Sequence, residues 1–79
     1  MEDVNEQVGA RVRAIREGRG LRLFDLAVKC EGRMLPGKLS NLELGKQRWT
    51  VDDVLLVAKA LGVTAAELMG ERESSTAAA

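Results

Sequence analysis

Residues 20–45 of the chain, which read GLRLFDLAVKCEGRMLPGKLSNLELG, decide the fold. In the first half, apolar residues recur at the helical spacing i, i+3, i+4, i+7: Leu23, Leu26, Ala27 and Cys30. The second half begins with Pro36, whose missing N–H suits a first helical turn, and ends at Gly45. Its expected buried face consists of Leu35, Leu39 and Leu42. The sequence thus predicts two short helices joined by a glycine-containing turn at 31–34.

The flanking residues predict three further helices. One runs from about residue 4 to residue 17, buries Val8, Val12 and Ile15, and ends at Gly18 and Gly20. Another begins at Thr50, with Asp53 three residues later as in a capping box, and ends at Gly62. Its expected inner face consists of Val51, Val54, Leu55, Ala58 and Leu61.

The last helix repeats the start signal with Thr64 and Glu67. We therefore expect an all-α, compact five-helix domain over residues 1–70. Residues 71–79 lack an apolar face and are expected to form a disordered tail or a truncated linker.

The composition argues against several classes of function. The 79 residues include no His and a single Cys30, so neither a zinc-ligand set nor an internal disulfide is expected. A Gly-rich phosphate loop and a Ser/His/Asp set are also missing, which predicts a protein that is not an enzyme and holds no cofactor or metal. No apolar run approaches the ~20 residues of a membrane span, and the acidic N-terminus is unlike a signal peptide, so we expect a cytoplasmic protein.

The net charge is zero, but the charges are distributed unevenly along the chain. Between residues 9 and 48 there are ten Lys and Arg against four acids, a net charge of +6, and the rest of the chain carries −6. A basic segment between acidic flanks is typical of a DNA-facing surface. From the charge distribution alone, solvated helix faces without a DNA partner are an equally good interpretation.

The middle of the chain resembles the Cro/CI-type (Xre) helix-turn-helix family. The resemblance rests on the order and spacing of Gly9, Arg16, Gly20-Leu21, Leu26-Ala27, Ser40-Asn41-Leu42-Glu43-Leu44-Gly45, Ala58-Lys59-Ala60-Leu61-Gly62-Val63 and Glu67-Leu68. It implies a lambda-repressor-like domain. Two features depart from the family pattern. Arg22 stands where a Ser or Thr cap is usual, and the turn before the third helix is about two residues longer, as in the actinobacterial developmental regulators of the BldD type.

The resemblance implies that the third helix enters the DNA major groove by its N-terminal end. If its leucines face the core, its outward positions are Pro36, Gly37, Lys38, Ser40, Asn41 and Leu44. The expected base contacts are Lys38 to guanine, Asn41 to adenine, Ser40, and Arg33 from the long turn. The expected phosphate contacts are Arg16, Arg22, Gly37, Lys46, Gln47 and Arg48. The alternative for these side chains is a solvated surface.

The family also implies a partly buried, structural ion pair between Arg16 and Glu43. Trp49 is expected to cover the core, with a dimer contact as the alternative. Phe24, Leu56 and Val57 lie off the expected apolar faces and are candidates for a partner surface.

The leading hypothesis is a sequence-specific transcriptional regulator of a bacterium or phage, either a repressor or an activator. It would bind a double-stranded operator as a homodimer with half-sites ~34 Å apart. A protein-interaction module on the same fold, such as an antitoxin or an anti-repressor partner, is the alternative. A third possibility is the N-terminal domain of a longer regulator.

Overall fold

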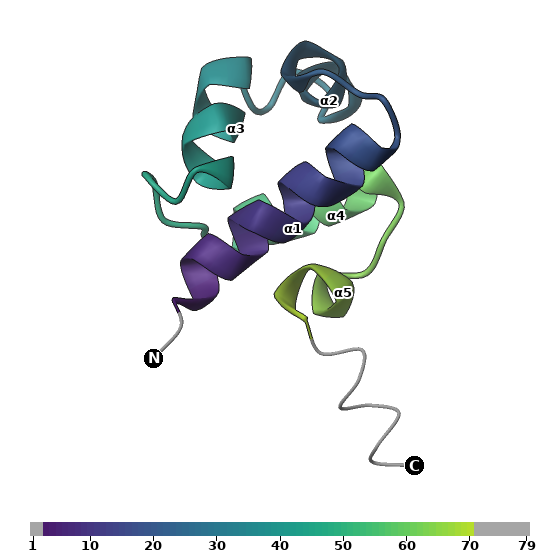
Figure 1. Ribbon diagram of the computed structural model, residues 1–79. Coiled ribbons are helices and arrows are strands. Elements are labelled where there is room, and N and C mark those ends of the chain that lie inside the picture. The colour runs from purple at the N-terminus through teal and green to yellow at the C-terminus, as the bar shows by residue number, and fades with distance from the viewer. Residues whose placement is uncertain (1–2, 71–79) are drawn as a thin grey trace.

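The computed structural model describes residues 3–70 as an all-helical domain (Figure 1). Its helices are α1 (Val4–Gly18), α2 (Leu23–Lys29), α3 (Pro36–Glu43), α4 (Val51–Leu61) and α5 (Ala65–Met69). In Figure 1, α2 and α3 lie on one side of α1, α5 lies on the other, and α4 runs behind. The prediction of a five-helix domain is confirmed. The tail predicted for residues 71–79 lies outside the described residues.

The last two helices begin at the predicted caps. Thr50 accepts a hydrogen bond from the N–H of Asp53, and the Asp53 carboxylate accepts one from the N–H of Thr50. Thr64 and Glu67 form the same reciprocal pair at the start of α5. At the start of α2, Asp25 accepts the N–H of Arg22 at 2.8 Å, so a carboxylate stabilises this helix end although the usual Ser or Thr is missing.

The core lies where α1, α2, α3 and α4 meet, and Leu68 of α5 joins it. The predicted buried stripes of α1 and α2 are confirmed, with Ile15 and Leu23 only partly buried. Cys30 is fully buried, and this burial raises the pKa of its thiol. Within residues 3–70 no group of His, Cys, Asp and Glu is arranged to hold a metal ion. No helix among these residues has the length and apolar character needed to cross a membrane.

The predicted inner face of α4 is wrong at two positions. Val51 and Leu55 are exposed, whereas Val57, which was expected on the outside, is fully buried, and Leu56 is partly buried against the core. The observed stripe is Val54, Val57, Ala58 and Leu61. Periodicity could not separate the two faces, because apolar residues occupy nearly every direction around this helix.

The predicted buried face of α3 is wrong at Leu35, which is 71% exposed. The helix begins one residue later, at Pro36, so Leu35 is the N-cap in extended backbone, outside the helical repeat. Met34 precedes it and is buried together with Leu39, the fourth residue of the helix. This is the arrangement of a hydrophobic staple, in which the residue before the cap packs against the fourth helical residue and fixes the angle at which the chain enters the helix.

Candidate nucleic-acid interface

α3 is held in place from its buried side by an ion pair with α1. The Arg16 guanidinium donates from Nε to Glu43 Oε2 at 2.7 Å and from Nη2 to Glu43 Oε1 at 2.9 Å. Its Nη1 donates to the carbonyl oxygen of Leu21, so all three nitrogens have partners. Both residues are buried, 8% and 7% exposed, and the hydrogen bond to Glu43 raises the pKa of Arg16. The ion pair implied by the family resemblance is thus present, and it fixes α3 against α1.

A phosphate contact by Arg16, which was expected from the sequence, does not fit this geometry. The side chain is buried and its guanidinium nitrogens are all hydrogen-bonded within the domain. A phosphate would have to approach a residue that is only 8% exposed and already neutralised by Glu43. We therefore regard Arg16 as purely structural.

Gly9 allows α1 to approach α3 closely. A Cβ added at this position would lie 2.8 Å from the carbonyl oxygen of Glu43 and closer still to that of Leu42. Both oxygens belong to the backbone, which cannot move aside as a flexible side chain does. The glycine therefore sets the spacing between α1 and the last turn of α3.

The polar residues expected on the outward side of α3 differ in how far they are exposed. Asn41 is exposed, Ser40 is partly buried, and Gly37 is exposed in the first turn. Lys38 is partly buried, and its Nζ lies 3.2 Å from Oδ1 of Asp53, the capping residue of α4. Sequence reasoning assigned Asp53 to the cap alone and missed this second role, because the Lys38–Asp53 contact joins residues far apart in the chain.

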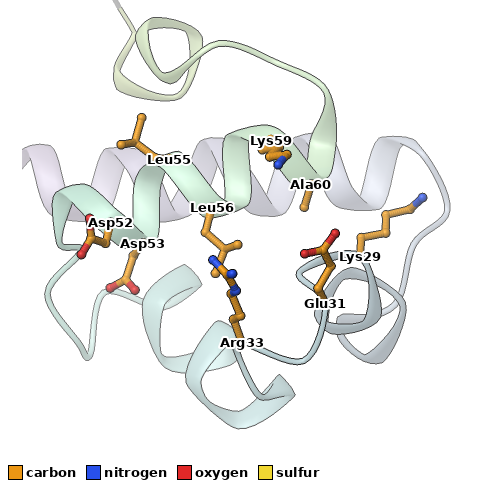
Figure 2. A pocket seen from close by; sticks show the side chains of 9 residues that line it. All are labelled: Lys29, Glu31, Arg33, Asp52, Asp53, Leu55, Leu56, Lys59 and Ala60. Carbon is orange, nitrogen blue, oxygen red and sulfur yellow. The ribbon is translucent and has the colours of Figure 1, made fainter.

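Arg33 lies in the turn between α2 and α3, as expected, but its side chain points toward α4. It lines a groove of about 840 Å³ together with Lys29, Glu31, Leu56 and Lys59 (Figure 2). Three cations and the carboxylates of Glu31, Asp52 and Asp53 share this groove, so its charge is mixed. A base contact by Arg33 requires the side chain to leave the groove.

The loop after α3 carries the remaining expected contacts. Lys46, Gln47 and Arg48 are exposed, and none of their side chains has a hydrogen bond or ion pair within residues 3–70. Gly45, at φ 77°, allows the chain to leave the helix, and the N–H of Lys46 donates back to the carbonyl of Asn41 at 2.9 Å. Arg22, the other phosphate candidate, is exposed beside Asp25 at the start of α2.

Two residues fix the position of this loop. Asn5 of α1 donates to the carbonyl of Gln47 at 3.2 Å and accepts the N–H of Trp49 at 2.6 Å. The Trp49 indole donates to the carbonyl of Leu42 at 3.1 Å and packs partly buried against the core, as the predicted lid. The role of Asn5 was missed, because nothing in its local sequence distinguishes it from a solvated residue at a helix start.

Helices α2 and α3 are joined by a turn and pack against α1, and α3 has a polar outer side. This arrangement defines a helix-turn-helix domain. The model of the family described as helix-turn-helix domain matches residues 7–69, and the chain belongs to this family. It is therefore a non-enzymatic, DNA-binding transcriptional regulator with a Cro/CI-type domain.

Two solved structures are similar to this chain, and both are crystal structures of the clp gene regulator ClgR from Corynebacterium glutamicum. One is 32% identical with a TM-score of 0.80 and covers 95% of each chain. The other is 32% identical with a TM-score of 0.79 and covers 98% of this chain and 80% of the other. A comparison with curated protein sequences gives no match.

Proposed function

We propose that this domain regulates transcription by binding a double-stranded operator with the N-terminal end of α3 in the major groove, in the cytoplasm and on the nucleoid. The observation that supports it best is the outer side of α3, where exposed Asn41 lies one loop away from the unpaired cations Lys46 and Arg48. Asn41 would pair with adenine, which offers a donor and an acceptor at its major-groove edge. The long turn before α3 also favours a regulator of the BldD type.

Lys38 would read guanine only after giving up its contact with Asp53. The exchange is feasible, because the Lys38 side chain is 38% exposed and the contact is a single one at 3.2 Å. When Lys38 leaves, the Asp53 carboxylate still accepts the N–H of Thr50 and keeps a partner. Guanine O6 and N7 together offer two acceptors in place of one carboxylate oxygen. Ser40 beside it would reach a base or a phosphate.

The loop 46–48 would bind phosphates, and salt dependence tests this. Each neutralised phosphate contributes about 0.9 to the slope of log affinity against log salt. Lys46→Ala and Arg48→Ala should each lower that slope by about 0.9, and Lys59→Ala, which removes an exposed cation of α4, should leave it unchanged. A protein-interaction module, the alternative function, would bind DNA weakly at every salt concentration in this titration.

Gly37 would allow the backbone to approach the duplex closely. A Cβ at this position meets nothing within 4 Å, so folding does not require a glycine there. Gly37→Ala should therefore raise the free energy of unfolding by up to ~1 kcal/mol, because alanine favours the helix. It should lower the affinity for DNA. Gly18→Ala, at the end of α1, has equally open surroundings and should stabilise the domain without changing DNA affinity. Unchanged affinity in Gly37→Ala would rule out the close approach.

Of the partner surface expected from the sequence, Phe24 is exposed, but Leu56 is partly buried and Val57 is fully buried. A homodimer on DNA would instead use Val4, Val51, Leu55 and Met69, which are exposed around an apolar groove of about 320 Å³. Clusters of exposed apolar residues mark interaction sites. Val51→Glu should shift the sedimentation of the domain toward the monomer, and a glutamate at the start of α4 suits the helix dipole. Phe24→Glu, an exposed control on α2, should leave the assembly intact; equal effects would contradict this dimer surface.

A further inference from the structure

Leu35 exposes a large apolar side chain at the start of α3. Among the exposed apolar residues of α2, α3 and their connections it has the largest exposed fraction, 71%, compared with 63% for Phe24 and 51% for Leu44. Core packing does not explain it, because Met34 fills the neighbouring core position and is buried. Leu35 is therefore not needed to fill the core, and its side chain is available to contact a molecule bound by the domain.

The N-cap of α3 and its first two residues carry no polar side chain. Leu35, Pro36 and Gly37 follow one another, and no side chain caps the helix start. Lys38, the first polar side chain, is engaged with Asp53. Before Lys38, the end of the helix that would enter the groove first therefore has only apolar side chains and backbone groups.

The major groove contains one apolar group that such a surface can recognise. Thymine carries a 5-methyl group at its groove edge, and apolar side chains read it by contact. We propose that Leu35 is a specificity-determining residue that contacts a thymine methyl group in each operator half-site. This inference rests on the proposed docking of α3 in the major groove, and it adds a contact that the polar residues of the helix cannot make.

Replacing thymine by deoxyuridine removes the methyl group without changing base pairing, which gives a direct test. Sites are first selected from random duplexes with the wild-type protein, and each thymine of the selected site is then replaced singly. We expect one thymine in each half-site at which the replacement weakens wild-type binding about fourfold, as for the loss of one buried methyl group.

Leu35→Ala should bind the unmodified site more weakly and show no further loss at that thymine. Leu44→Ala removes an exposed leucine at the opposite end of α3 and should keep the wild-type sensitivity. Thermal unfolding checks that both variants remain folded. Equal sensitivity of wild type and Leu35→Ala at every thymine overturns the inference. In that case specific binding of the unmodified site still supports the proposed function; a wild-type protein that selects no sequence overturns both.

Discussion

Glu43→Ala is expected to lower the free energy of unfolding by about 3–5 kcal/mol, because it leaves the Arg16 charge buried without its partner. The guanidinium is 8% exposed and donates two of its hydrogen bonds to Glu43. The loss is comparable to the whole stability of a domain this small. Chemical denaturation of the wild type and the variant measures it directly.

The double replacement Arg16→Met with Glu43→Leu is the matched control. It removes both charges and fills their space with apolar atoms, so it should be closer to the wild type than Glu43→Ala is. If Glu43→Ala costs less than about 1 kcal/mol, the pair behaves like a surface ion pair and does not hold α3 in place.

Gly9→Ala should destabilise the domain by about 1–3 kcal/mol, although alanine normally favours a helix. The usual stabilisation by alanine is reversed here, because an added Cβ would clash with the backbone carbonyl oxygens of Leu42 and Glu43. α1 would have to move away from α3, so DNA affinity should fall as well. Thermal unfolding and DNA titration of the same variant measure both effects.

Gly18→Ala is the control for Gly9→Ala, since it places the same methyl group on the same helix where nothing lies within 4 Å. It should stabilise the domain slightly. Similar melting temperatures for the two variants would show that α1 and α3 are not held at the spacing described above.

Local signals in the sequence predicted the helices well, and tertiary contacts account for what was missed. The caps at Thr50 and Thr64 depend on residues three positions apart, so they can be read from the chain. The buried face of α4 could not be predicted, because Val51, Leu55 and Val57 are all apolar. Only tertiary packing decides which of them is buried. Leu35 was misplaced because the staple uses Met34 as the core residue.

In the candidate site, too, tertiary contacts account for what the sequence did not predict. Asn41 and the loop residues Lys46 and Arg48 are exposed where the resemblance placed them. The Lys38–Asp53 contact and the orientation of Arg33 toward α4 depend on a helix that lies far away in sequence. Fewer cations of the basic segment are available to bind DNA than its net charge of +6 suggests. Arg16 is buried with Glu43, Arg13 pairs with Glu17, and Arg19 donates to the carbonyl of Leu61 at the end of α4.

Selection of binding sites from random duplexes, with the wild type and Asn41→Ala in parallel, tests the central claim that the outer side of α3 reads DNA. The account predicts a pseudo-palindromic site with half-sites ~34 Å apart. It also predicts that Asn41→Ala loses the preference for adenine at one position of each half-site. Lys38→Ala, run alongside, should relax a guanine position. If both variants select the same sequence as the wild type, these residues do not read DNA and the account is wrong.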